Sequence, residues 1–371
     1  MTAHHYDVVV IGAGVAGASL CLQLARQGVR VALVEKGTVG AGGATALSGG
    51  IVRVHDPDPF LSSLSAAGRN LLLNWSKLGV EGPSPYTKSG VYWLKSDQPG
   101  RSIATDTRVG RVADFPRLNF LRERSDPLHV LYEPDSGYVD ARRLCASLVQ
   151  SAINLGVDVY ENTHVVGYEV STSGEVTVRT HSGSFTAHKV ALCAGAGFVQ
   201  MTRMEGAYVR SIPLVTVRAN SVRLETPIID ETASTYMRPL RSGVFFCGSQ
   251  KWSVPGEEFD RKAVANDALK RLRLVLGRNV DIEVINVDQK YDAYSHDLRP
   301  VIRFIDGKSV LFLGCLSGRG VKYSLAVGVL AARKLIQSMS GHYQESVWDD
   351  CIGEELPMLV TQANSDEMVD A

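Results

Sequence analysis

Residues 6–35 read YDVVVIGAGVAGASLCLQLARQGVRVALVE, and this stretch decides the fold. The apolar run over 8–11 predicts a strand buried on both faces, as in a parallel sheet. A helical pattern follows over 18–27, and a second apolar strand over 29–34 ends at Glu35. Between the first strand and the helix lie the three glycines of a GxGxxG motif, Gly12, Gly14 and Gly17. This order predicts a dinucleotide-binding βαβ unit.

Each glycine of the motif has its own physical task. Gly12 permits the tight turn, Gly14 lets the backbone approach a pyrophosphate, and Gly17 lets the helix pack closely on the strand. The pyrophosphate then meets unpaired N–H groups at the helix N-terminus. Glu35 is placed to accept hydrogen bonds from ribose hydroxyls and would repel a 2′-phosphate. A glycine turn that binds nothing is the alternative, and the surrounding strand, helix and acid disfavour it.

Composition narrows the class of protein. The chain has 371 residues, 45% of them hydrophobic and 21% charged, which is typical of two globular domains or one large one. Its net charge is zero, so no basic excess favours nucleic acid or an anionic membrane. The six cysteines form no CxxC pair, which disfavours a disulfide scaffold or a structural metal site. Without a long apolar run or signal-peptide pattern, we expect a cytoplasmic protein that does not span a membrane.

Two further glycine-rich segments favour FAD over a nicotinamide cofactor. Residues 40–50, GAGGATALSGG, let the backbone pass close to a large, flat ligand. Residues 315–324, CLSGRGVKYS, lie between a buried strand over 309–314 and an apolar helix over 325–336. A glycine turn at a helix N-terminus can offer N–H donors to the flavin pyrimidine, where negative charge develops on reduction.

With these motifs the chain resembles the D-amino-acid oxidase superfamily, and within it the sarcosine and glycine oxidase branch. The resemblance extends to Gly137–Leu144 (GYVDARRL), to the strands over 156–170, to 189–197 with its Ala-Gly-Ala, and to Ser-Gly-x-Gly-x-Lys-x-Ser over 317–324. It covers most of the cofactor-binding part and matches the rest loosely. It implies an α/β fold, with an FAD-binding Rossmann-like domain of the GR2 type and a second α+β substrate domain on a mostly antiparallel sheet.

The resemblance also implies a discontinuous organisation. The FAD-binding domain takes residues 1–80, 140–210 and 290–340, and the substrate domain takes 81–139 and 211–289. Residues 341–371 form an acidic C-terminal tail without Lys or Arg. A frayed surface tail is the simpler interpretation of it, and a partner-docking tail is the alternative.

The resemblance assigns the FAD contacts to four groups of residues. Asp292 stands where sarcosine oxidases carry the cysteine that bonds the flavin, so we expect non-covalent FAD. The expected contacts are Gly12, Ala13, Gly14, Val15, Ala16 and Gly17; Glu35, Lys36, Ala44, Thr45, Ser48, Gly49 and Gly50; Val165, Ala194 and Gly195; and Gly318, Arg319, Gly320, Val321 and Lys322. Arg319 replaces a histidine that is frequent in the family.

In that branch an Arg and a Lys hold the substrate carboxylate, and here they match Arg53 and Lys322. A guanidinium with an ammonium is a sensible clamp for a carboxylate. The alternative for Arg53 is an ion pair with a local acid, Asp56 or Asp58.

Three more residues are candidates for a catalytic role. Arg238 is a competing carboxylate clamp, or else a solvated edge charge. Lys251 lies near the position where sarcosine oxidases use a Lys to promote reaction with oxygen, although a solvated Lys is the simpler reading. His296 places an ionisable ring in the loop by the expected pocket, or it is a loop His bonded to backbone.

The expected function is oxidation of the C–N bond of a small amino acid or related amine, with hydride transfer to flavin N5 and reoxidation by oxygen to give hydrogen peroxide. One alternative is a dehydrogenase of an amine or 2-hydroxy acid that passes electrons to a quinone or carrier. Others are a tailoring flavoenzyme on a larger or carrier-bound substrate and a flavin-holding subunit without catalysis. We expect no metal and no nucleic acid partner.

Overall fold

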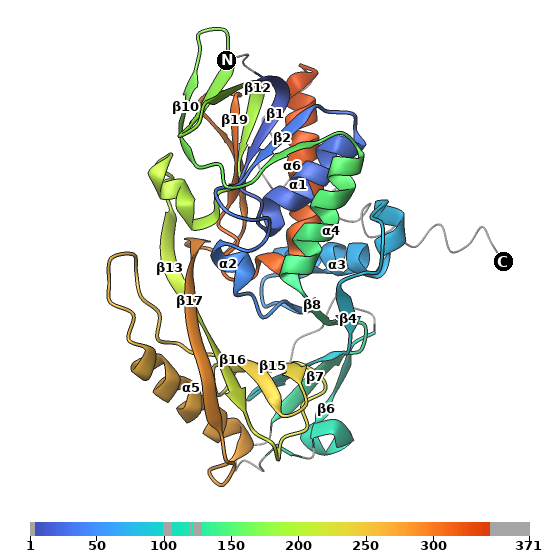
Figure 1. Ribbon diagram of the computed structural model, residues 1–371. Coiled ribbons are helices and arrows are strands. Elements are labelled where there is room, and N and C mark those ends of the chain that lie inside the picture. The colour runs from blue at the N-terminus through green and yellow to red at the C-terminus, as the bar shows by residue number, and fades with distance from the viewer. Residues whose placement is uncertain (1–3, 99–105, 119, 122–127, 342–371) are drawn as a thin grey trace, which may run out of the picture.

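A computed structural model describes residues 4–98, 106–118, 120–121 and 128–341. Two bodies are stacked along the long axis of the molecule (Figure 1), each built around an eight-stranded sheet. The upper body contains the N-terminal βαβ unit, and the lower body contains most of the middle of the chain. The prediction of an α/β fold with a second, mostly antiparallel sheet is confirmed.

The upper sheet is parallel at its centre. Its parallel strands, in spatial order, are β9 (Asp158–Tyr160), β2 (Val31–Val34), β1 (His4–Ile11), β12 (Ser184–Leu192) and β19 (Val310–Gly314), and β18 (Val301–Ile305) adds an antiparallel edge to β19. On the side of β12 that its second half presents to β19, its first half pairs with β11 (Val176–Thr180), which forms an antiparallel meander with β10 (Val165–Val170). The long strand β12 therefore joins the parallel centre to the meander.

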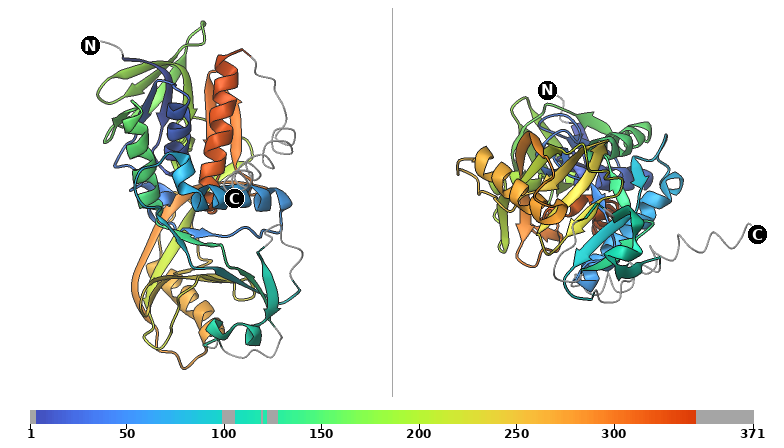
Figure 2. Two further views of the ribbon diagram at one scale, coloured as in Figure 1. Left: turned by 90° about the vertical axis from the view of Figure 1, so that its right-hand side faces the viewer. Right: turned by 90° about the horizontal axis from the view of Figure 1, so that it is seen from below.

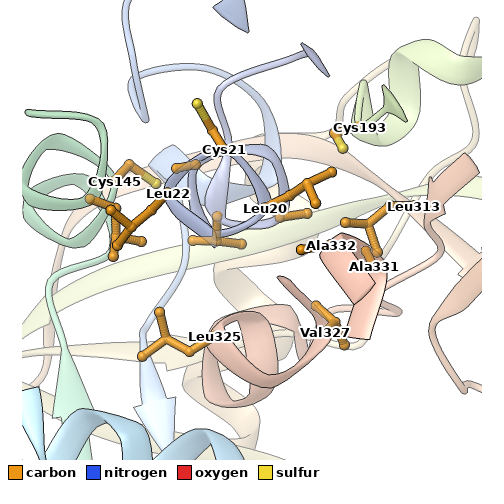
Figure 3. Packing of buried hydrophobic residues seen from close by; sticks show 14 of the residues in the cluster. Leu20, Cys21, Leu22, Cys145, Cys193, Leu313, Leu325, Val327, Ala331 and Ala332 are labelled. Atoms are coloured by element: carbon orange, nitrogen blue, oxygen red, sulfur yellow. The ribbon is translucent and has the colours of Figure 1, made fainter. Parts of the chain in front are cut away.

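Both faces of this sheet are buried, as the apolar run at its start predicts. One face packs against α1 (Val15–Arg26), α4 (Ala141–Asn154) and α6 (Ser324–Met339). Figure 3 shows Cys145 of α4 beside Leu22 of α1, with Ala331 and Ala332 of α6 toward Leu20. The other face packs under the meander. The five described cysteines are free and buried, as expected, and Cys351 lies outside the described residues.

The lower sheet is antiparallel except where β14 and β5 pair in parallel. Its strands, in spatial order, are β17 (Glu283–Ser295), β13 (Ala207–Arg218), β16 (Val244–Gly248), β15 (Thr235–Arg241), β14 (Ile228–Asp230), β5 (Val91–Lys95), β7 (His129–Glu133) and β6 (Arg108–Arg111). Helix α5 (Arg261–Leu276) covers one face of it. The long strands β13 and β17 run from the lower body to the upper one (Figures 1 and 2).

Smaller elements complete the fold. A three-stranded antiparallel sheet is made of β3 (Ile51–Val52), β8 (Gly137–Val139) and β4 (Tyr86–Lys88). The helices α2 (Gly43–Ala46) and α3 (Pro59–Leu73) flank β3 in sequence, and short 3₁₀ turns are η1 (Trp75–Leu78), η2 (Val112–Asp114), η3 (Pro116–Leu118), η4 (Gly195–Gln200) and η5 (Gly320–Tyr323).

Element ends differ slightly from the sequence pattern. Helix α1 begins at Val15, inside the glycine motif, because Gly14 already has the extended conformation of an N-cap residue. Strand β2 begins at Val31, and α6 continues to Met339. Among the described residues, no helix is both long and apolar enough to cross a membrane.

The expected domain boundaries at 210 and 290 fall inside β13 and β17. We propose that the two sheets, rather than those two positions, mark the division between the domains. The predicted acidic tail lies outside the described residues, apart from its first position.

Candidate active site

The carboxyl ends of four parallel strands lie side by side in the upper sheet. Ile11 of β1 is in register with Val34 of β2 and with Leu192 of β12, and Leu192 is in register with Phe312 of β19. Three of the segments predicted to bind the cofactor leave the sheet at this edge, after β1, β12 and β19. Ligands of open α/β sheets bind outside the carboxyl ends of the strands, so this edge is the candidate cofactor site.

The glycine motif after β1 is tightly packed. Gly12 has φ +101°, and a Cβ there would lie 2.6 Å from the carbonyl oxygen of Cys193, beside the predicted Ala194 and Gly195. A Cβ on Gly17 would lie 1.9 Å from the Gly12 carbonyl oxygen. Only glycine therefore permits this approach of α1 to β1 and β12.

The N-terminus of α1 has no side-chain cap and no acid in its first turn. The Oγ1 of Thr45 accepts a hydrogen bond from the Val15 backbone N–H at 3.2 Å, and it lies 3.0 Å from the place of a Cβ on Gly14. The second glycine-rich segment thus borders the first, as expected for one extended ligand. A helix N-terminus whose N-cap residue is a glycine, beside further glycine backbone, suits a pyrophosphate.

Glu35 lies at the end of β2, where the sequence predicts it. Its carboxylate accepts hydrogen bonds from the backbone N–H groups of Ala13 at 2.8 Å and of Gly37 at 2.9 Å. The Thr163 N–H donates to the Glu35 carbonyl oxygen, which brings the start of β10 with Val165 close by. Lys36, also predicted to contact FAD, is exposed.

The rest of the second glycine-rich segment leads to the lower body. Ser48 Oγ accepts a hydrogen bond from the Gly50 N–H at 3.0 Å. A Cβ on Gly50, which has φ +64°, would lie 2.0 Å from the Val139 carbonyl oxygen. Gly49 faces the ring of Tyr236 on β15, which lies 3.3 Å from the place of its Cβ. Ala44, at the start of α2, is half-buried.

The C-terminal glycine turn is unusually shaped. Cys315, Ser317 and Gly318 all have positive φ, at 54°, 54° and 69°. This conformation is costly for the two residues that are not glycine, and such strain concentrates at functional sites. After the turn, η5 presents Arg319, Gly320, Val321 and Lys322.

A buried carboxylate holds this turn. Asp292 of β17 accepts hydrogen bonds from the N–H groups of Gly318 at 2.8 Å and of Ala293 at 2.9 Å. Burial raises the pKa of Asp292 to about 6, although these N–H groups oppose the rise. Asp292, which we predicted to stand at the position of the flavin-bonding cysteine, therefore contacts the turn predicted to face the flavin.

Beside that turn, three cations surround one buried carboxylate. Asp56 lies 3.1 Å from Lys322 Nζ, 3.2 Å from Arg319 Nη1 and 3.5 Å from Arg53 Nη1. The side chains of Asp56 and Lys322 are only 2% and 3% exposed. The structure thus places Arg53 and Lys322 around the same carboxylate, and the ion pair of Arg53 with Asp56 is the one given as the alternative for Arg53.

The cluster is short of negative charge. Burial and the neighbouring Arg53 lower the pKa of Lys322 to about 7, although Asp56 opposes the fall. Burial would raise the pKa of Asp56, but Lys322, Arg53 and Arg319 lower it below its usual value. Asp56 is therefore a stable anion, and the excess of cations around it favours binding of a further anion.

The sequence analysis missed Glu133, and it named Asp56 only as a possible ion-pair partner of Arg53. Glu133, 1% exposed at the end of β7, accepts hydrogen bonds from the N–H groups of Val54 at 2.8 Å and His55 at 2.6 Å, and from Ser136 Oγ. It fixes the backbone between Arg53 and Asp56. No local motif marks this role, because the contact joins segments distant in sequence.

The remaining predicted catalytic residues lie apart from this cluster. Lys251 follows β16 and is exposed, and His296 is exposed with its ring 5.6 Å from that of Tyr208. Arg238 of β15 is buried, with its Cζ 4.2 Å from the ring centre of Tyr138. In the described part of the chain, the ion pairs of Asp56 involve none of these three residues.

These observations fit a flavin dinucleotide. Residues of the glycine motif and Glu35 suit the pyrophosphate and ribose, and the strained turn over 315–318 offers backbone to the pyrimidine. No group of three or more metal-ligating side chains occurs among the described residues. The fold and site together define a two-domain flavoprotein of the oxidoreductase class.

Comparison with known families also identifies the protein as a flavin-dependent oxidoreductase. Residues 7–334 match the family model of FAD-dependent oxidoreductases known as DAO. The chain belongs to this family, its cofactor is FAD, and the family predicted from the sequence is confirmed.

Two relatives illustrate the range of the family. The chain is similar to a glycine oxidase of Geobacillus kaustophilus, 27% identical over 302 residues that cover 76% of this chain and 78% of the relative. It is also similar to the mitochondrial sarcosine dehydrogenase of Mus musculus, at 25% identity over 62% of this chain and 28% of the relative.

Solved structures show the same fold. L-proline dehydrogenase from P. horikoshii superposes with a TM-score of 0.80 at 16% identity, covering 94% of this chain and 96% of that one. Glycine oxidase from Geobacillus kaustophilus has a TM-score of 0.74 at 20% identity, covering 93% and 97%.

Proposed function

We propose that the protein oxidises the C–N bond of a small amino acid or related amine, with hydride transfer to flavin N5. The single observation that carries this proposal is the buried cluster in which Arg53, Arg319 and Lys322 share one carboxylate, Asp56. Among the relatives, glycine oxidase and sarcosine dehydrogenase support an amine with a carboxylate as the substrate.

FAD, when bound, supplies the acceptor of two electrons. The protein's own residues bind and orient the substrate. Arg53 and Lys322 hold its carboxylate through charge-assisted hydrogen bonds, and Glu133 fixes the backbone that carries Arg53. Arg53 cannot swing freely, because its guanidinium stacks 4.0 Å from the ring centre of Trp93. Such fixed geometry aligns a substrate C–H bond with its acceptor.

The test is an anaerobic titration of the yellow holoprotein with amines and 2-hydroxy acids. We expect amines that carry a carboxylate to bleach the flavin absorbance. In Arg53→Met, KM should rise roughly 100-fold with a smaller change in kcat, because a charged contact made in the ground state is lost. Bleaching by hydroxy acids alone, or by no compound, would contradict the proposal.

We further propose that oxygen reoxidises the flavin and forms hydrogen peroxide. One observation favours a second candidate, a dehydrogenase that passes electrons to a quinone or carrier. The Lys expected to promote reaction with oxygen, Lys251, is exposed and apart from the charge cluster. Peroxide formed in air at the rate of substrate oxidation supports the oxidase, whereas dye reduction without peroxide supports the dehydrogenase.

Two further points belong to this proposal. FAD is held without a covalent bond, because Asp292 occupies the position of the bonding cysteine; flavin that stays on the acid-precipitated protein would contradict this. The five free, buried cysteines support a reducing compartment such as the cytoplasm.

A further inference from the structure

Arg238 lies on a distinctive face of the lower sheet. Alternation along β15 and β16 sends Met237, Phe245 and Cys247 into the core under α5, so their neighbours Arg238 and Phe246 face the opposite way. Trp93 of β5 is on that same opposite face, where it contacts Arg53. Arg238 and the charge cluster are therefore on one side of the sheet.

The distance between them follows from the register. Trp93 pairs with Ile229, and Ile229 pairs with Tyr236, two residues before Arg238. Two strand spacings and two residues along a strand separate the backbones of Trp93 and Arg238 by about 12 Å. Arg238 also contacts Tyr138, whose strand partner Ile51 lies two residues before Arg53.

Arg238 is a buried cation without a partner. It is 8% exposed, and its guanidinium lies between the rings of Tyr138 at 4.2 Å and Phe246 at 5.4 Å. Within the part of the chain that the structure describes, it makes no ion pair, and its buried Nε has no hydrogen-bond partner. Burial lowers the pKa of Arg238 and the charge of Asp140 opposes this fall, but the Asp140 carboxylate accepts the capping hydrogen bonds of α4.

A buried guanidinium without an anion is costly unless a ligand supplies one. Its fork of donors is suited to a planar carboxylate, and the two rings beside it hold the fork in place. In the proposed function Arg53 and Lys322 hold the α-carboxylate of the substrate. An anion that pairs with Arg238 would then be a second acidic group.

We propose that Arg238 binds a second acidic group of the substrate, so that the site selects amines with two carboxylates. This inference rests on the proposed function for the identity of the reacting amine. It makes Arg238 a residue that determines specificity, and Arg53 with Lys322 the partners of the carboxylate common to all substrates.

The test compares diacids with monoacids of equal length as ligands of the holoprotein. Succinate, glutarate and adipate are titrated against butyrate, valerate and hexanoate, with binding followed by the flavin spectrum and by calorimetry. We expect the best diacid to bind roughly 10- to 100-fold more tightly than its monoacid, as for one added charge-assisted contact.

Variants assign the preference to Arg238. Arg238→Gln should bind diacid and monoacid alike, and Arg238→Lys should restore part of the difference. Arg53→Gln should weaken both ligands. The matched control is Arg241→Gln, an exposed Arg on the same strand, which should behave as wild type.

Equal affinities in the wild type, no binding of either ligand, or an unchanged preference in Arg238→Gln would each overturn the proposal. If Arg238→Gln fails to fold, the wild-type comparison and Arg238→Lys decide whether Arg238 causes the preference for diacids. A diacid preference in a protein that oxidises no amine would contradict the proposed function and leave standing only the binding of a second acidic group by Arg238. Turnover of monocarboxylic amines without any diacid preference would support the proposed function and contradict this inference.

Discussion

The two glycine turns of the cofactor site are held in different ways. The first, over 12–17, packs so closely on the strands beside it and on its own helix that Gly12 and Gly17 leave no room for a Cβ, and Glu35 accepts a hydrogen bond from its backbone. The second, over 315–322, is held by side chains from far away, with Asp56 lying 266 positions from Lys322 and Asp292 lying 26 positions from Gly318. Both turns are bound by a carboxylate from another segment, but the first also requires glycines without a Cβ, whereas the second carries the cations that surround Asp56.

Of the changes considered, removal of the shared carboxylate of Asp56 should destabilise the protein most. Asp56→Asn leaves Lys322, Arg53 and the partly exposed Arg319 near one another without their shared anion, and we expect a loss of about 3–5 kcal/mol in the free energy of unfolding. Denaturant unfolding in the absence of carboxylate ligands measures it. Asp58→Asn is the matched control, because Asn preserves the N-cap of α3 and the ion pair with Arg299 is partly exposed. Equal losses in the two variants would contradict the assignment.

Crowding the first turn should have the next largest effect. In Gly17→Ala the new methyl group meets the Gly12 carbonyl oxygen, so α1 must move away from β1. We expect a loss of about 1–3 kcal/mol and a protein that purifies without yellow colour. The ratio of flavin to protein absorbance measures this. Gly197→Ala is the control, because its Cβ would be 3.7 Å from Ala194, an ordinary contact.

The second turn should respond to pH, unlike the first. Because the pKa of Lys322 is about 7, its ammonium is lost as pH rises. Binding of a simple carboxylate to the holoprotein should then weaken by up to about tenfold per pH unit above pH 7. A ligand without an amine avoids titration of the substrate itself. Lys322→Met should bind weakly with no such dependence, and a retained dependence would assign it to another group.

The same lowered pKa has a consequence for stability. Between about pH 7 and the ordinary Lys pKa of 10.5, the unfolded chain holds a proton that native Lys322 has released. Stability without ligand should therefore rise with pH over this range through this group. Lys322→Met should lack that contribution in pH-dependent denaturant unfolding.

The smallest expected effect is the change in the pH dependence of stability when Asp292 is replaced. Its pKa is about 6 in the native state and 3.8 in the ordinary one, so the native protein binds more protons between these values and loses stability as pH rises through about 6. Asp292→Asn removes this dependence. The melting temperature of the variant, relative to wild type, should be higher at about pH 8 than at about pH 4. A constant difference would contradict the raised pKa.

The sequence by itself determined the βαβ unit, its glycine motif with Glu35, and the family, because these depend on neighbouring residues and on strand order. It also proposed Arg53 and Lys322 from matching motifs. Only the tertiary structure placed both beside Asp56, added Arg319 to that cluster, revealed Glu133 and showed that Arg238 is buried without an ion pair among the described residues. The physical reason is that burial and long-range ion pairing set the charge balance of a site, and neither is encoded in local sequence.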